Sequence, residues 1–238
     1  MGRKIAILQA GVNNIALSPD QPDPPALFRA LFAKNCEHTR FDISVFPVIY
    51  GEFPKDISQF DGFVITGSAS GVYEDDPWIA KLLHMITDIV DAEIPIVGIC
   101  FGHQAIAKAL GGEVVKSPKG WGLGIRTVDM TEAGNALPDS DSCLKLIYVH
   151  QDQVIKLPEN AVRIAGDDFC PNAAFRIDDK VLTFQGHPEF TPSYVTELYD
   201  VLEPRVGSEK AAQAHKSMSE TDDGQKVGQW IVSFLNRS

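Results

Sequence analysis

The sequence predicts an α/β fold in which a mostly parallel central sheet carries helices on both faces and gains short antiparallel strands. Two observations predict it. Up to residue 112, apolar runs of strand length alternate with segments of helical periodicity. Beyond it, short β-type runs follow one another between turns, which favours antiparallel additions to the sheet. No Pro/Gly/Ser-rich linker divides the 238 residues, so we expect one domain over 1–238.

The first half of the chain begins with three predicted strands and two predicted helices. Apolar and β-branched runs predict the strands at 4–10, 41–48 and 63–67. The helix at 24–35 opens with two prolines and has an apolar stripe, and the helix at 78–92 is strongly amphipathic. Between the last strand and this helix lies a loop of small, acidic and aromatic residues, SASGVYEDDP. The alternation indicates parallel strands joined by helices.

The second half is predicted to be mainly short strands with helices at its end. The β-type runs are EVVKS, GLGIRTVDM, CLKLIYVH, AVRIAG, NAAFRID and KVLTFQGHP. Two helices are predicted at 191–203 and about 223–236, with a polar stretch between them, so a helical extension occupies about 205–238. The last helix has one apolar face, formed by Trp230, Ile231, Phe234 and Leu235. We expect this face to dock on its own domain, with another chain as the alternative.

Composition and charge argue against several classes of partner. The formal net charge is −11 and no long run of lysine or arginine occurs, which disfavours nucleic acid or an anionic membrane as the main partner. The first residues, MGRKIAILQAGVN, lead into a strand without the apolar region of a signal peptide. Four cysteines lack metal-like spacing, which indicates no zinc site and a reducing compartment. We therefore expect a cytoplasmic protein.

One of these cysteines stands in a special context. In PIVGICFGHQAIAKALGG (95–112), Cys100 lies on a glycine-flanked turn between a short buried strand and a helix. The unpaired amides and the dipole of the first helical turn stabilise a thiolate, the reactive form of cysteine. The same strand–turn–helix geometry presents the nucleophile of many hydrolases. Cys100 is therefore the candidate nucleophile.

A cysteine nucleophile needs a base, and His187 is the best candidate. It follows the apolar run VLTFQG, and Glu189 lies two residues further on, across a proline that keeps the segment extended. Side chains two residues apart in an extended segment face the same side, so Glu189 can orient the imidazole. A surface turn without chemistry is the alternative. His103 lies in the first helical turn after Cys100, and a structural role is expected for it.

The attacked carbonyl also needs hydrogen-bond donors for its developing charge. The N–H of Phe101, directly after the nucleophile, is the natural first donor. Gly67, in ITGSAS, can bring a second amide close because it lacks a Cβ. An ordinary flexible loop explains Gly67 equally well.

Four motifs together resemble the class I glutamine amidotransferase family. In chain order they are TGS (66–68), GICFGHQ (98–104), HQD (150–152) and GHPE (186–189), and the resemblance runs from about residue 40 to 200. The nearest branch is the free-standing, GMP-synthase-like amidotransferase domain. The resemblance implies a flavodoxin-like fold, with Cys100 as nucleophile, His187 as general base and acid, and Glu189 as its orienting group. It also implies an oxyanion hole at Gly67 and Phe101, and substrate contacts at Ser68, Gln104, His150, Gln151 and Asp152.

This resemblance implies hydrolysis of a γ-glutamyl amide, most simply glutamine, to glutamate and ammonia through a γ-glutamyl thioester. No metal or organic cofactor takes part. The loop TGSASGVYEDDPWI departs from the glycine-rich loop of synthetase-type members, and we expect no synthase domain on the same chain. Ammonia would then pass to a separate partner. Two alternatives stay open: a γ-glutamyl peptidase acting on γ-glutamyl peptides or glutathione conjugates, and a non-catalytic regulatory or binding subunit.

Overall fold

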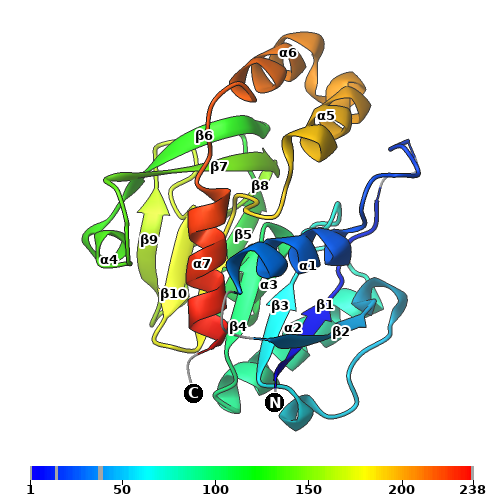
Figure 1. The fold of residues 1–238 in the computed structure, drawn as a ribbon, viewed down its shortest axis with the longest axis vertical. Helices are drawn as coiled ribbons and strands as arrows, with labels where there is room; N and C mark the ends of the chain where they lie inside the picture. Colours follow the sequence, from blue (N-terminus) through cyan, green and yellow to red (C-terminus); the bar gives the residue numbers. More distant parts are fainter. Residues whose placement is uncertain (1, 14–15, 37–39, 237–238) are drawn as a thin grey trace.

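The chain forms a nine-stranded sheet and a two-stranded sheet in a computed structural model that describes residues 2–13, 16–36 and 40–236 (Figure 1). The strands of the first half are β1 (Arg3–Leu8), β2 (Phe41–Phe46), β3 (Gly62–Ile65) and β4 (Ile96–Ile99). Those of the second half are β5 (Glu113–Lys116), β6 (Gly122–Met130), β7 (Cys143–His150), β8 (Asp152–Lys156), β9 (Val162–Gly166), β10 (Ala174–Ile177) and β11 (Val181–Phe184).

Seven α-helices are found in the described residues: α1 (Pro24–Asn35), α2 (Pro77–Asp91), α3 (Phe101–Ala109), α4 (Glu132–Asn135), α5 (Pro192–Val206), α6 (Ser208–Ser217) and α7 (Gly224–Leu235). Two short 3-10 helices, Val48–Tyr50 and Ile57–Gln59, lie between β2 and β3. The start of α1 follows from its sequence, because the Asp23 carboxylate accepts a hydrogen bond from the amide of Ala26 at 2.8 Å. Pro24 then occupies a position where no amide is needed.

The strand order confirms the predicted fold class. The order in the large sheet is β2-β1-β3-β4-β11-β10-β9-β6-β7. The pairs from β2 to β11 are all parallel, and those from β11 to β7 are all antiparallel. Strands β5 and β8 pair separately, also antiparallel. The centre is therefore a parallel sheet to which the second half of the chain adds antiparallel strands.

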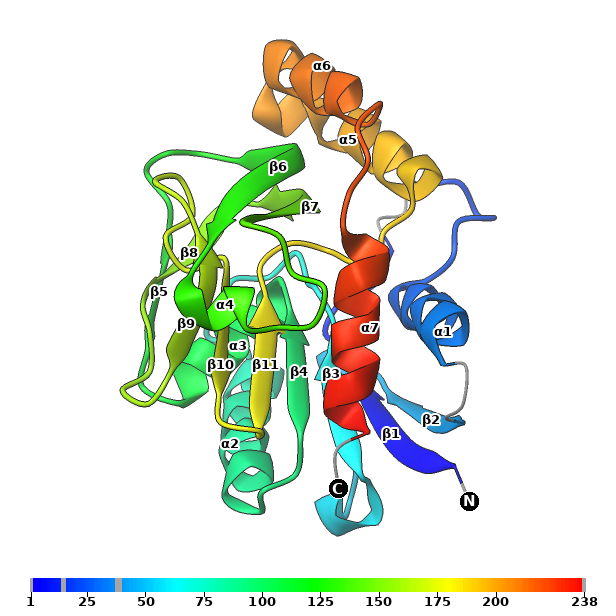
Figure 2. The ribbon, with the colours of Figure 1, turned by 60° about the vertical axis from the view of Figure 1, so that its left-hand side comes forward.

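Helices cover both faces of the parallel part, and the alternation along β1 shows how. Ile5 and Ile7 pack in one apolar cluster with residues of α1 and α7, whereas Ala6 and Leu8 pack in another with residues of α2 and α3. Figure 2 shows α1 and α7 together on one side of the sheet and α2 on the other. Because both faces are buried there, the central strands β3, β4 and β11 are almost wholly apolar.

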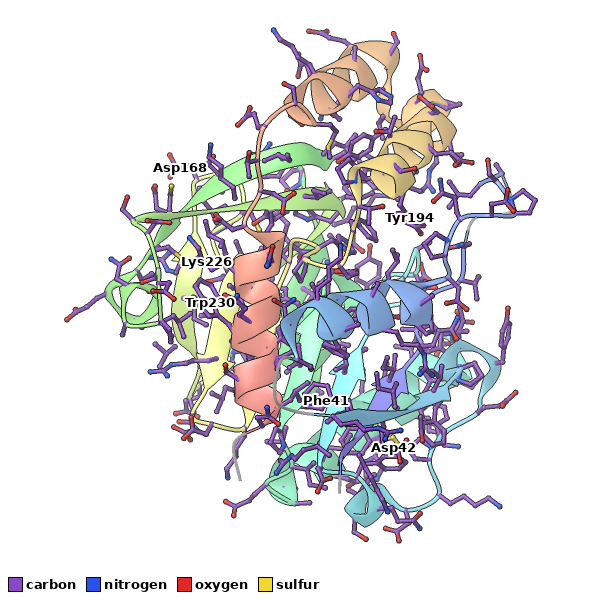
Figure 3. The ribbon with its side chains drawn as sticks, in the orientation of Figure 1. Phe41, Asp42, Asp168, Tyr194, Lys226 and Trp230 are labelled. Carbon is purple, nitrogen blue, oxygen red and sulfur yellow. The ribbon has the colours of Figure 1, made fainter. Side chains whose placement is uncertain are left out.

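The last helix docks on its own domain, as expected. Trp230, labelled on α7 in Figure 3, stacks on Phe184 at a centroid distance of 6.4 Å, and its indole N–H donates to the carbonyl of Pro138 at 2.8 Å. Gly228 lies against α1, where an added Cβ would meet the side chain of Leu31 at 2.8 Å. The apolar face found in the sequence is therefore part of the core.

Helices α4 and α6, strand β8 and the two 3-10 helices were not predicted from the sequence. The polar stretch before the last helix forms α6, which packs on β6 through the buried alanines Ala211 and Ala214 and through Ser217, whose hydroxyl accepts from the amide of Ile125 at 2.9 Å. Two alanines make too weak an apolar stripe to be recognised, so tertiary contacts decide this helix. Strand β8 begins at Asp152, the last residue of the HQD motif, and pairs with β5. Among the described residues, no helix has both the length and the apolar character needed to cross a membrane.

Candidate active site

The candidate site lies where three neighbouring parallel strands end. Ile65 of β3 pairs with Gly98 of β4, and Ile99 of β4 pairs with Phe184 of β11. The carboxyl ends of these strands therefore meet at one edge of the sheet, which is where α/β proteins gather ligands. The segments that follow them carry Gly67, Cys100 and His187.

Cys100 stands on a strained turn between β4 and α3. Its backbone has φ 52° and ψ −101°, a conformation that residues other than glycine rarely adopt. The two flanking glycines make the turn sterically possible: a Cβ on Gly98 would lie 2.5 Å from the carbonyl oxygen of Gly102, and one on Gly102 would lie 2.4 Å from that of Ile65. The turn holds the buried thiol at the N-terminus of α3.

His187 and Glu189 form a buried pair beside Cys100. Nδ1 of His187 lies 2.7 Å from Oε1 of Glu189, and their side chains are 5% and 3% exposed. Burial alone lowers the pKa of His187. The negative charges of Glu189 and Cys100, and hydrogen bonds to both, outweigh burial and raise the pKa to about 10. At neutral pH the imidazole is thus a cation that lies between the Glu189 carboxylate and the Cys100 sulfur.

An aromatic ring fixes the plane of this imidazole. Phe190 stacks on His187 with ring centroids 3.9 Å apart and an interplanar angle of 3°. The backbone amide of His187 also donates to the carbonyl of Ile147 at 2.8 Å. Sequence reasoning missed Phe190, although its place directly after the GHPE motif is a usable signal.

The two predicted oxyanion-hole residues lie on either side of the thiol. A Cβ added to Gly67 would lie 3.0 Å from Cε1 of His187 and 3.7 Å from Cβ of Cys100. Phe101 is the first residue of α3, so the helix does not use its amide. The Phe101 ring points into the core, where it packs against Trp78 at 5.5 Å. The backbones of Gly67 and Phe101 therefore both lie close to Cys100.

A cleft of about 270 Å³ opens above Cys100. Its lining includes every residue predicted for the site except Phe101: Gly67, Ser68, Cys100, Gln104, His150, Gln151, Asp152, His187 and Glu189. These residues come from four separate stretches of the chain, which the topology brings to one place.

Gln104 and His150 form a polar wall of this cleft. The amide nitrogen of Gln104 donates to the carbonyl of Asp152 at 2.9 Å and to Oε1 of Gln185 at 3.0 Å. His150 donates through Nδ1 to the same carbonyl at 3.0 Å. Burial lowers the pKa of His150 to about 4, so this ring is neutral at pH 7. Gln185, which sequence reasoning missed, holds Gln104 in place.

Comparison with known proteins decides the family. The family model for class-I glutamine amidotransferases matches residues 26–198. The chain belongs to the class I glutamine amidotransferase family. It is 33% identical over 192 residues to γ-glutamyl peptidase 3 of Arabidopsis thaliana, covering 77% of each chain, and 30% identical to a glutamine amidotransferase-like protein of Schizosaccharomyces pombe, covering 99% of each.

Solved structures show the same fold. A glutamine amidotransferase from Thermotoga maritima superposes with a TM-score of 0.74 at 20% identity, over 97% of this chain and 96% of that one. A GMP-synthase subunit protein from Thermoplasma acidophilum gives a TM-score of 0.60 at 23% identity, over 90% and 98%. Amidotransferase domains bind glutamine and can act as subunits of synthases such as GMP synthase. This chain is accordingly an enzyme of the cysteine hydrolase or amidotransferase type.

The loop that departs from synthetase-type amidotransferases forms one rim of the cleft. Tyr73, which is 48% exposed, donates its hydroxyl proton to the carboxylate of Asp152 at 3.0 Å. Burial and this carboxylate raise the pKa of Tyr73 to about 12. A hydrogen bond inside the loop stabilises its conformation: the Glu74 carboxylate accepts from the amide of Gly71 at 2.9 Å. The contact between loop and Asp152 joins segments 79 residues apart and has no local sequence signal.

His103 lies outside the cleft. It is fully buried, and its Nδ1 forms a hydrogen bond of 2.8 Å with the hydroxyl of Thr183. Burial lowers the pKa of His103 to about 3, which keeps the ring neutral. His103 of the GICFGHQ motif is thus a neutral core residue, whereas His187 of the GHPE motif is a charged residue of the site.

Proposed function

We propose that this amidotransferase-family enzyme hydrolyses a γ-glutamyl amide, with glutamine as the simplest substrate, and that Cys100 is its nucleophile. The observation that carries the proposal is the buried ion pair: His187, with a pKa near 10, lies between Glu189 and Cys100. A thiolate next to an imidazolium is ready to attack a carbonyl and has a proton donor beside it. The ordinary alternative, a surface His-Glu turn, does not fit side chains that are about 5% exposed.

The reaction then proceeds in two halves. The Cys100 thiolate attacks the γ-carbonyl, and the N–H groups of Gly67 and Phe101 stabilise the oxyanion. His187 gives its proton to the departing nitrogen, so the carbon–nitrogen bond breaks and a γ-glutamyl thioester remains. His187 next takes a proton from water, which attacks the thioester and releases glutamate and the free thiolate. Glu189 keeps the imidazole oriented and stabilises its charged form.

The remaining predicted residues hold the glutamyl part of the substrate. Ser68, Gln104 and the backbone of 150–152 surround the cleft beside the thiol, and we propose that they bind the α-amino acid end. The Asp152 carboxylate, which lines the cleft, supports this role, and the hydrogen bonds of Gln104 and His150 to the Asp152 carbonyl hold this wall in place.

The second candidate is a γ-glutamyl peptidase, and the relatives favour it. The Arabidopsis protein that is 33% identical bears that name. Both substrates present the same γ-glutamyl carbonyl to the nucleophile, so side-by-side turnover of glutamine and a γ-glutamyl dipeptide decides between them. If glutamine is the substrate, a synthase partner in trans is the proposed acceptor of ammonia, and co-purification followed by assay of the complex tests it.

We further propose one domain over 1–238, of which residues 1, 14, 15, 37–39, 237 and 238 lie outside the described residues. A cytoplasmic location is proposed as well. The free cysteines Cys36, Cys100, Cys143 and Cys170 support a reducing compartment.

Replacement of Cys100 by alanine tests the function. Release of glutamate and ammonia should fall at least a thousandfold, because no other group can form the thioester. A diazo-ketone analogue of glutamine should label Cys100. The half-buried Cys36 and Cys143 are internal controls for the labelling. Turnover that survives in Cys100→Ala, or labelling at Cys36 or Cys143 instead, would refute the mechanism.

A further inference from the structure

The lining of the cleft extends beyond the residues proposed to hold the γ-glutamyl group and continues along α5. Besides the site residues, the lining includes Phe190, Tyr194, Leu198, Leu202 and Arg205. The last four are spaced by four, four and three residues on one helix, so they share one face of α5. Figure 3 shows Tyr194 at the start of that helix, between α5 and α1.

This face begins beside the proton donor. Phe190 stacks on His187 at 3.9 Å, and Tyr194 packs against Phe190 with ring centroids 4.9 Å apart. In the proposed reaction His187 protonates the departing nitrogen, so the leaving group must lie on the His187 side of Cys100. The wall that continues from His187 along α5 is therefore placed to contact the leaving group and not the glutamyl part.

The wall is apolar and ends in a cation. Leu202 is buried and Leu198 is half-buried, and Val12, which also lines the cleft, is 48% exposed. At the far end, the guanidinium of Arg205 lies 5.5 Å from the centre of the Trp121 ring, which also lines the cleft. Ammonia, the leaving group from glutamine, has a single heavy atom and is too small to contact the apolar wall along α5.

We propose that the α5 face is a leaving-group subsite, specific for an amine that carries an apolar side chain and a carboxylate. Such an amine is the amino-acid part of a γ-glutamyl dipeptide. Its apolar side chain lies on Leu198 and Leu202, and Arg205 binds its carboxylate. The chemical balance is that of an amide hydrolysis: one water is consumed, and glutamate and the amino acid are released. This inference rests on the proposed γ-glutamyl hydrolase function.

The test compares three substrates: glutamine, γ-glutamylphenylalanine and γ-glutamylphenylalanine amide. We expect the wild-type kcat/KM for γ-glutamylphenylalanine to exceed that for glutamine at least tenfold. Leu198→Ala should lower this ratio about fivefold, because the lost side chain contacts only the phenylalanine part. Val201→Ala is the matched control: it is also half-buried on α5 but does not line the cleft, so the ratio should stay within twofold.

The amide substrate tests the cation. The preference for γ-glutamylphenylalanine over its amide is the ratio of their kcat/KM values. Arg205→Ala should lower this ratio about fivefold, because only γ-glutamylphenylalanine carries the carboxylate. Lys34→Ala, which removes the same charge from the exposed end of α1, should not change it. Ratios measured on one variant cancel any loss of folded protein.

Each outcome is decisive. Equal wild-type turnover of glutamine and the dipeptide, or equal ratio changes in Leu198→Ala and Val201→Ala, would overturn the subsite and leave the hydrolase function standing. Absence of Cys100-dependent turnover with all three substrates would overturn both.

Discussion

The parallel and antiparallel parts of the large sheet contribute different things to the site. In the parallel part, β3, β4 and β11 are buried at every residue, because helices cover both faces. In the antiparallel part, β7 and β9 alternate or are partly exposed. The residues of the proposed reaction follow the buried strands, whereas Val149 and His150 lie at the end of β7 and Trp121 directly precedes β6. The reacting groups thus follow the more deeply buried strands, and the antiparallel part adds one wall of the cleft to those formed by Ser68, Gln104 and α5.

If this division holds, substitutions at the ends of the parallel strands should lower kcat, and substitutions in the outer walls should raise KM. The predictions below test that contrast, beginning with the largest expected effect.

Glu189→Gln should lower kcat at least a hundredfold with KM changed less than threefold. A glutamine cannot balance the imidazolium charge, so the pKa of His187 falls and the thiolate loses its partner. Steady-state assays over pH measure both effects. Glu203→Gln, an exposed carboxylate on α5, is the matched control and should behave as wild type. A kcat within fivefold of wild type would remove Glu189 from the mechanism.

Gly67→Ala should lower kcat roughly tenfold while the protein stays folded. The new Cβ would come within 3.0 Å of Cε1 of His187, so the ring or the loop must shift by a few tenths of an ångström. Thermal unfolding checks the fold and kinetics check the rate. An unchanged kcat would show that this loop is not held against the reacting atoms.

The ion pair of His187 and Glu189 should also contribute to the free energy of unfolding. The pKa of His187 is raised from 6.5 to about 10 on folding, so the folded state binds this proton more tightly. Its contribution to the free energy of unfolding is full below pH 6.5 and is lost as the pH rises to about 10. Urea unfolding of wild type and His187→Gln at pH 6, 8 and 10 measures it. The stability advantage of wild type should shrink across this range; a constant difference would contradict a charged His187.

Tyr73→Phe should have the smallest effect, a two- to threefold rise in KM at unchanged kcat. The lost hydrogen bond to Asp152 lies at a half-exposed rim, where such contacts contribute little. Burial raises the pKa of Asp152 and the Tyr73 bond partly opposes this, so the rise in KM should grow towards acidic pH. Tyr50→Phe, on an exposed ring elsewhere, is the control. A large fall in kcat would show that the Tyr73 loop takes part in the chemical step and contradict this prediction.

Much of this arrangement was predictable because its signals are local. The strand–glycine–cysteine–glycine–helix pattern predicts the turn at Cys100, and an extended GHPE segment predicts that His187 and Glu189 face the same side. Strand β8 and helix α6 escaped prediction, since their stability comes from pairing with β5 and packing on β6. Phe190 and Gln185 escaped for a related reason: which groups they hold depends on where other strands end.

The sequence by itself determined the fold class, the family resemblance and the order of the site motifs, because short-range periodicity and steric rules act within a few residues. Only the tertiary structure decided the electrostatics and the shape of the cleft. Burial keeps His103 and His150 neutral, whereas two neighbouring negative charges keep the equally buried His187 protonated. The face of α5 likewise lines the cleft only because folding places it beside His187. Charge state and cleft shape depend on neighbours distant in the chain, and local patterns do not contain them.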